Sequence, residues 1–237
     1  MKNYIPLLAM LLCVSLFSCN DSDDPKQTPT VPESVTFNFE SDAQGWEGGF
    51  ADYPQNSDAF YEIAFGHAQL PEPLDQGQHA LRQTGNNHSD DLFMFAKKKL
   101  TNLPANTSIN LKFTLEIASN AANASFGVGG SPGSSVYVKA GATATEPKAI
   151  KDGNYWRMNI DKNNQANGGK DMALLGDFAN GTEENTYALK TLKNTEPFNV
   201  TTNDNGEVWL IVGTDSGFES TTTIYYNSIK VEFSQPE

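Results

Sequence analysis

Short runs in which apolar and polar residues alternate follow one another along most of the chain. In the clearest run, Ile109 to Ile117, every second residue is apolar, so one face of an extended strand would be buried. Gly, Asn, Asp and Pro separate nearly all of these runs. Further runs that predict strands lie at residues 35–39, 60–65, 92–100, 126–128, 136–138, 155–160, 172–175, 208–212 and 224–233. Many short strands with frequent turns predict an all-β fold, a jelly-roll-like antiparallel β-sandwich.

The first segment of the chain has the pattern of an export signal. Lys2 gives a basic start, and the apolar run from Ile5 to Phe17 is too short for a comfortable membrane-spanning helix. The run closes with Leu16-Phe17-Ser18-Cys19, which resembles a bacterial lipobox. This resemblance implies cleavage before Cys19 and diacylation of its sulfur. An ordinary secretory signal with an incidental cysteine is the alternative.

A polar, acidic and proline-containing stretch from Asn20 to Ser34 follows the signal and has no apolar periodicity. Its composition predicts an extended, solvated tether. We therefore expect a signal peptide at residues 1–18, a tether at 19–34 and one β-sandwich domain at 35–234. We expect the protein in the cell envelope, lipid-anchored to the outer membrane. The acidic start of the tether resembles the surface-export signals of some outer-membrane lipoproteins.

Cysteine usage and charge exclude several classes of function. The two cysteines are Cys13, which leaves with the signal, and Cys19, so the mature domain has no disulfide, no cysteine zinc site and no cysteine nucleophile. The formal net charge of −13 makes nucleic acid an unfavourable partner. The membrane contact that we expect is the lipid itself.

The two ends of the domain carry a more specific pattern. Phe37-Asn38-Phe39-Glu40 leads to Gly45-Trp46, and the chain closes with Ile224-Tyr225-Tyr226-Asn227-Ser228-Ile229-Lys230-Val231. This pairing resembles the jelly-roll sandwich of carbohydrate-binding and galactose-binding-like modules. The resemblance implies glycan binding and a structural calcium ion held by Glu40 and by residue 227, where this chain has Asn in place of the usual Asp.

A second resemblance covers most of the chain from Phe39 to Val231. The segments at residues 49–54, 87–95, 129–133 and 159–169 together are similar to a group of uncharacterised bacterial secreted proteins. No activity follows from this similarity.

The best candidate for a site is the stretch Gly85 to Phe95, in which a dense polar run turns abruptly into an apolar one. A polar loop held by a buried strand is a common place for a binding site. Its polar groups suit sugar hydroxyls or a hard cation, although a plain turn built from Asn and Asp explains them equally well. We expect a concave, ligand-binding site lined by residues of this loop and of two other loops: Asn87, His88, Asp90, Asp91, Ser131, Lys162 and Asn164.

The remaining chemistry-bearing residues carry weaker signals. The three histidines, at positions 67, 79 and 88, lack the spacing of a zinc site, and hydrogen-bonded structural roles are favoured. The amide-rich run from Asp161 to Asp171 departs from the EF-hand order, so a long hairpin loop is favoured over a calcium loop. We expect Trp46, Trp156 and Trp209 to pack in the core.

The sequence therefore favours a non-catalytic glycan-binding module without a cofactor. One alternative is an enzyme that cleaves a polysaccharide with an acid and a base drawn from Asp90, Asp91, Glu62 and Glu146, which requires two carboxylates facing each other. A structural or assembly partner in an envelope complex is the other alternative.

Overall fold

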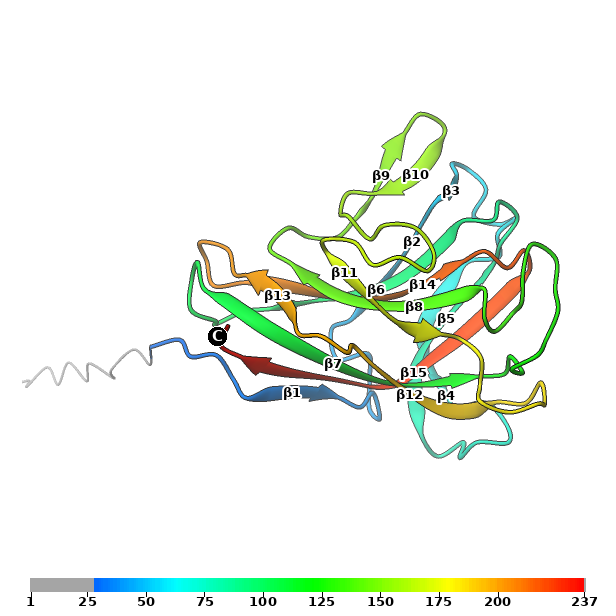
Figure 1. Ribbon diagram of the computed structural model, residues 1–237, viewed down its shortest axis with the longest axis horizontal. Coiled ribbons are helices and arrows are strands. Elements are labelled where there is room, and N and C mark those ends of the chain that lie inside the picture. Colours follow the sequence, from blue (N-terminus) through cyan, green and yellow to red (C-terminus); the bar gives the residue numbers. More distant parts are fainter. Residues whose placement is uncertain (1–27, 237) are drawn as a thin grey trace, which may run out of the picture.

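The computed structural model describes residues 28–236, and every regular element within them is a β-strand. The predicted all-β, antiparallel sandwich is confirmed (Figure 1). None of these residues forms an apolar helix of membrane-spanning length. The predicted signal peptide at residues 1–18 and Cys19 lie outside the described residues.

Two antiparallel sheets face each other across the core. The larger sheet contains, in spatial order, β12 (Ala188–Lys193), β7 (Ser108–Ser119), β15 (Thr221–Ser234), β5 (His79–Asn86) and β4 (Ala64–Gln69), with β1 (Ser34–Phe37) beside β15 and β13 (Phe198–Thr201) beside β7. The smaller sheet contains β11 (Met172–Asp177), β8 (Val136–Thr143), β14 (Val208–Ser216), β6 (Leu92–Leu100) and β2 (Glu47–Ala51). The chain passes repeatedly from one sheet to the other, as in a jelly roll.

Strand alternation decides which side chains fill the space between the sheets. On β7 the apolar residues from Ile109 to Ile117 are fully buried, as the sequence predicted. On β14, Leu210 and Val212 point into the same core, while Ile211 between them points outward. Burying each such aliphatic side chain stabilises the fold by roughly 1.5–3 kcal/mol.

A small third sheet covers part of the outer face of the smaller sheet. It consists of β3 (Tyr53–Pro54), β10 (Tyr155–Met158) and β9 (Ala149–Asp152), and in Figure 1 it stands above β2 and β6. Met158 and Ile160 pack there against Phe93 and Phe95 of β6. Residues on both faces of β6 are therefore buried, which explains its continuous apolar run.

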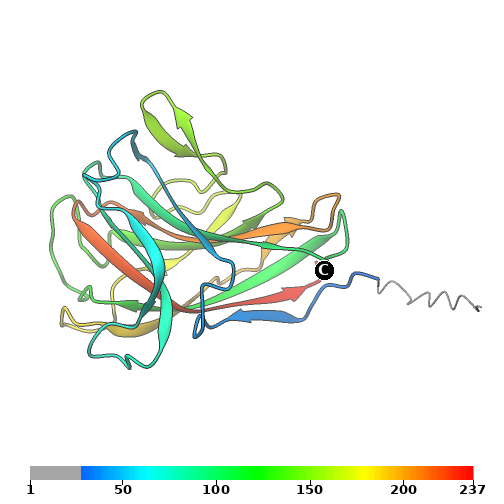
Figure 2. The same cartoon turned by 180° about the vertical axis from the view of Figure 1, so that it is seen from behind.

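Five loops that join the sheets gather at the end of the sandwich away from the C-terminus, which we call the loop end (Figures 1 and 2). The strand order of the two sheets places these loops side by side in a fixed sequence. In that order they comprise residues 178–187, 120–135, 217–220, 87–91 and 55–63. The row matters because neighbouring loops can share one surface.

The strand predicted at 126–128 is wrong, and the one predicted at 60–65 is right only for residues 64–65, which begin β4. Residues 60–63 form turns ahead of β4, and residues 126–128 lie in the long loop between β7 and β8. Phe60, Phe126 and Val128 are exposed, whereas Tyr61 of the first run is buried although it lies outside any strand. Trp46 is buried as expected, whereas Trp209 is half-buried on the outer face of β14.

Candidate functional site

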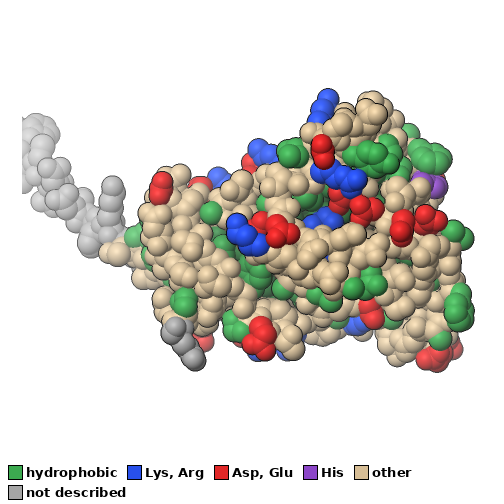
Figure 3. All heavy atoms as spheres, turned by 45° about the horizontal axis from the view of Figure 1, so that its top comes forward, with side chains coloured by type: hydrophobic (Ala, Val, Ile, Leu, Met, Phe, Trp, Pro, Cys, Tyr) green, Lys and Arg blue, Asp and Glu red, His purple; other side chains and the backbone are tan. Residues whose placement is uncertain are grey.

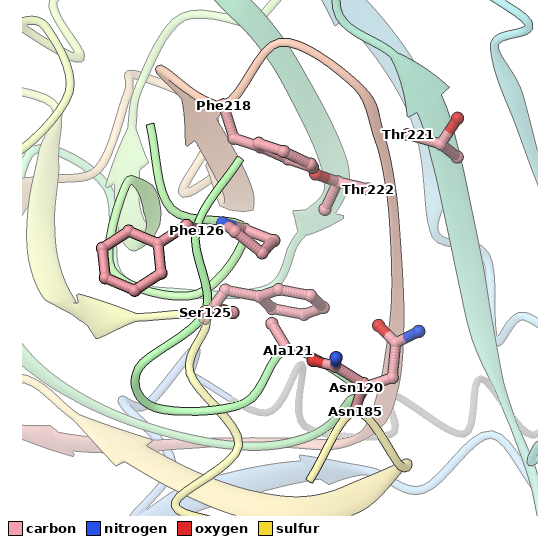
Figure 4. Close-up of a pocket in the computed structure, with 10 residues that line it drawn as sticks. Asn120, Ala121, Ser125, Phe126, Asn185, Phe218, Thr221 and Thr222 are labelled. Atoms are coloured by element: carbon pink, nitrogen blue, oxygen red, sulfur yellow. The ribbon is translucent and has the colours of Figure 1, made fainter. Parts of the chain in front are cut away.

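A pocket of about 220 Å³ opens at the loop end, between three neighbouring loops (Figure 4). The β7–β8 loop contributes Ser125, Phe126 and Pro132, and the β11–β12 loop contributes Asn185. Phe218 covers one side, and Phe126 stands at the rim with 97% of its surface exposed. An aromatic ring this exposed gains nothing from folding, so its place beside a pocket suggests a role in binding.

The chemistry of the lining is polar without charge. Besides the aromatic rings it presents amides and hydroxyls, and no residue that lines it is acidic or basic. The full lining consists of Asn120, Ala121, Ser125, Phe126, Pro132, Phe178, Asn185, Phe218, Thr221 and Thr222. Groups that both donate and accept hydrogen bonds, set beside apolar rings, suit a hydroxyl-rich neutral ligand.

Thr222 supplies a second sign of a binding site. Only 5% of this residue is exposed, and its Oγ1 atom is buried with no hydrogen-bond partner among the described residues. Leaving a buried hydroxyl without a partner costs free energy. A ligand hydroxyl or a water in the pocket would satisfy it.

Backbone and side-chain bonds fix the walls of the pocket. The backbone amides of Gly217 and Glu219 donate to the carbonyl oxygens of Ser135 and Val128, at 2.8 and 2.9 Å. On the other side, the amide of Ala122 donates to Asn185 Oδ1 at 3.2 Å. The three loops are thus joined to one another, so the pocket is preformed in the free protein.

Two of the residues predicted from the sequence support these walls rather than line the pocket. The side-chain amide of Asn87, which is 1% exposed, donates to the carbonyls of Ser216 and Phe218 at 2.8 and 3.0 Å. Ser131 Oγ accepts hydrogen bonds from the amides of Gly133 and Ser134, which shapes the turn beside Pro132. Both residues position neighbours of the site.

His88 lies on the surface next to this pocket. Its ring stacks on Phe60 at a centroid distance of 4.0 Å and an interplanar angle of 22°, and Nε2 lies 3.1 Å from the Phe60 carbonyl oxygen. Asp90 is also exposed; its carbonyl accepts from Gln165 Nε2 at 3.2 Å. His88 therefore does not form the floor of a pocket.

Asp91 and Lys162 instead join a network of ion pairs on the outer face of the smaller sheet. Lys162 Nζ lies 2.9 Å from Asp52 Oδ2, and Arg157 Nη1 donates to Asp52 Oδ1 at 3.0 Å and to Asp91 Oδ2 at 3.1 Å. These bonds hold β10 and the loop that follows it against the sheet. Acidic and basic side chains accordingly intermingle on this face (Figure 3).

The deepest part of this network is the pair Lys139 and Asp215, both fully buried. Their Nζ and Oδ2 atoms lie 2.8 Å apart, and Lys162 Nζ lies 2.9 Å from the same oxygen. Burial lowers the pKa of Lys139, and Asp215 offsets only part of that effect. Burial also acts to lower the pKa of Lys162, but its two carboxylate partners outweigh it, so the net pKa is raised.

Asp91 has the most perturbed carboxyl of the predicted site residues. Burial raises its pKa to about 6, and the negative charge of Asp52 adds to the effect, against the opposing influence of Lys162 and Arg157. Asp52 and Asp91 accept from the same guanidinium nitrogen, so they form a bridged pair rather than an acid and a base flanking a substrate. Glu146, another candidate acid, is paired with Lys97 at 2.6 Å.

The structure thus divides the predicted residues between two places. Asn87 and Ser131 support the pocket, His88 and Asp90 lie beside it, and Asp91 and Lys162 belong to the ion-pair network. Asn164 is exposed, and its backbone takes part in the turn of its own loop, where its carbonyl accepts from Asn167. Whether this set binds a ligand stays a prediction.

Of the two implied calcium ligands, Glu40 and Asn227, the structure gives Asn227 a hydrogen-bond partner, since its Nδ2 donates to Glu116 Oε1 at 2.7 Å. Its Oδ1 is buried without a partner among the described residues. Within residues 28–236 no group of three His, Cys, Asp or Glu side chains could hold a metal ion. Calcium remains an untested prediction.

Sequence reasoning missed the aromatic residues that border the pocket. The Gly- and Asn-rich surroundings of Phe126 were a signal for a loop, but Phe126 and Val128, which lie on either side of Gly127, predicted a short strand instead. No comparable signal marked Thr222, whose role depends on loops far away in the sequence. Asp52 and Arg157 were missed for the same reason.

No protein-family model and no curated protein matches the chain. Similar solved structures include carbohydrate-binding modules from the β-sandwich superfamily, at 12% identity, with 84% of this chain and 61% of that chain covered and a TM-score of 0.41. A module specific for non-crystalline cellulose matches at 13% identity, with 87% and 96% covered and a TM-score of 0.37. The K1 cleaved adhesin domain of Lys-gingipain from Porphyromonas gingivalis W83 matches at 12% identity, with 86% and 99% covered and a TM-score of 0.38. At these scores the likeness identifies no ligand.

Proposed function

We propose that this protein is a non-catalytic glycan-binding module of the bacterial cell envelope and that it binds sugar in the pocket at the loop end. The observation that carries the proposal is the exposed ring of Phe126 beside an uncharged pocket of about 220 Å³. The C–H groups on the face of a sugar ring pack on the negative face of an aromatic ring. The surrounding amides and hydroxyls pair with sugar hydroxyls.

The electrostatics of the pocket also support this proposal. Its lining is neutral in a chain whose net charge is −13, so it favours neither phosphate nor a cation. Two of the four carboxylates considered for an enzyme, Asp91 and Glu146, are engaged in ion pairs. Binding without cleavage is the function that these residues serve best.

Anchoring by a lipid on Cys19 is part of the proposal, supported by the lipobox-like Leu16-Phe17-Ser18-Cys19 alone. A tethered module that captures glycans would hold them near the outer membrane. The proposal does not depend on which face of that membrane carries the protein.

A glycan array probed with the purified protein and with Phe126→Ala tests the function. Wild-type protein should bind a group of neutral glycans, and Phe126→Ala should lose that binding while its thermal unfolding is unchanged. Ile150→Ala is the matched control, because Ile150 is an exposed apolar residue (46%) on β9 and does not line the pocket. Retained binding by Phe126→Ala, or an array without hits alongside a reproducible protein partner in pulldowns, would overturn the proposal and favour an assembly role.

A further inference from the structure

The surface beside the pocket carries a second aromatic feature, the stacked pair Phe60 and His88. Phe60 is 63% exposed, and His88 is exposed as well. The buried ring of Tyr61 meets His88 edge-on at 5.3 Å and supports the pair from beneath. Stacking and the contact of His88 Nε2 with the Phe60 carbonyl hold the two rings in place, so the aromatic pair is preorganised.

The pocket and this aromatic pair belong to adjacent loops of the loop end. The pocket is bordered by the 217–220 loop, and the pair lies on the next two loops of the row, 87–91 and 55–63. Thr221, at the side of the pocket opposite Phe126 (Figure 4), pairs across the strands with Asn86. The amide of Asn86 in turn donates to the carbonyl of Tyr61 at 2.6 Å.

These pairings set the distance between the two features. Thr221 to Asn86 is one strand spacing and Asn86 to Tyr61 is a second, so the backbones of Thr221 and Tyr61, the residue next to Phe60, are about 10 Å apart. This separation is comparable to the length of a disaccharide. A pocket of about 220 Å³, by contrast, holds little more than one sugar unit.

We propose that Phe60 and His88 form a second subsite, which binds the sugar units next to the one in the pocket. The ligand is then an oligosaccharide whose terminal unit enters the pocket while the following units cross Asn86 and stack on the aromatic pair. This inference rests on the proposed function and adds to it the length of the oligosaccharide and the direction in which it lies across the loop end. Asp58 and Glu62, which flank Phe60 in sequence, favour neutral units over uronic acids because like charges repel.

Calorimetric titration of the purified full chain with xylo-, manno-, cello- and galacto-oligosaccharides of one to six units tests this subsite. For a series that binds, wild-type affinity should rise from one unit to three or four. Phe60→Ala and His88→Ala should remove that rise, with a loss of roughly three- to tenfold for the longer chains and none for the monosaccharide. His88→Phe keeps a ring in place and should retain the gain.

The variants separate failure of the subsite from failure of the pocket. Phe126→Ala should weaken binding at every chain length. If Phe60→Ala leaves the length dependence unchanged while Phe126→Ala abolishes binding, the second subsite is wrong and the pocket stands. If no series binds, or if Phe126→Ala binds as wild type does, the proposed function and the subsite both fall. Thermal unfolding of each variant verifies that the fold is retained.

Discussion

The side-chain amide nitrogen of Asn87 lies 3.0 Å from the carbonyl oxygen of Phe218 and donates a hydrogen bond to it. This contact ties the β5–β6 loop to the residue that covers one side of the pocket. The same amide nitrogen also donates a hydrogen bond to the carbonyl oxygen of Ser216. Asn87, which the sequence predicted to contact the ligand, thus supports the wall of the site.

Replacing Asn87 with Leu should therefore destabilise the fold and weaken glycan binding together. Two carbonyls that are bonded in the native protein lose their donor, at a cost of about 1–3 kcal/mol. Urea unfolding and a repeat of the glycan titration measure the two effects. Asn164→Leu, a change of the same type at an exposed position, should alter neither, and equal behaviour of the two variants would contradict the assigned role.

The buried pair Lys139 and Asp215 should dominate the stability of the outer face. Asp215→Asn removes the carboxylate that lies 2.8 Å from Lys139 Nζ and leaves that ammonium group buried without its partner. Breaking a buried pair in this way costs about 3–5 kcal/mol. Urea unfolding of the variant measures the loss.

The surface pair Lys230 and Glu232 provides the control for that experiment. Its atoms are 2.9 Å apart, close to the distance in the buried pair, but both side chains are more than 40% exposed. Water and salt screen such a pair, so Glu232→Gln should leave the unfolding midpoint almost unchanged. If Asp215→Asn were equally mild, the buried network would not be holding the fold.

Local patterns sufficed for the fold but not for the site. The alternation from Ile109 to Ile117 fixed which face of β7 is buried, because strand periodicity is a property of neighbouring residues. The residues at the two ends of the domain resemble those of jelly-roll sandwiches, and the chain does pass between two sheets as in that fold. The site instead depends on which loops the sheet order places side by side.

Two residues illustrate that limit. Asp91 and Arg157 are 66 positions apart in the sequence, yet they share a hydrogen bond at the outer face. Nothing near either residue in the sequence indicates the other. Asp91 and Lys162, both predicted at the site, join one ion-pair network through Arg157, Asp52 and Asp215.

Anchoring can be tested independently of glycan binding. Cys19→Ala removes the sulfur that the lipobox resemblance requires, so the protein should leave the membrane fraction or remain uncleaved. Fractionation with immunodetection and an intact-mass measurement distinguish these results. Unchanged membrane association with normal cleavage would exclude the lipid anchor.

The carboxyl of Asp91 should make stability depend on pH. Burial raises its pKa from 3.8 to about 6 in the native state, helped by the negative charge of Asp52. Between pH 4 and pH 6 the unfolded chain has released this proton while the native protein still holds it. The unfolding free energy contributed by Asp91 therefore falls as pH rises through this window and is fully present only below it.

Asp91→Asn should abolish that fall, because the amide resembles the protonated carboxyl at every pH. Relative to wild type, the variant should gain about 1–2 kcal/mol between pH 4 and pH 6.5, with solvent screening of the 30%-exposed side chain limiting the gain. The measurement is the unfolding free energy in urea at pH 4, 5, 6 and 7 for both proteins. Asp90→Asn, which removes the same charge from the exposed neighbour, is the matched control. A difference between Asp91→Asn and wild type that is constant with pH would show that the native and unfolded states hold the Asp91 proton equally well.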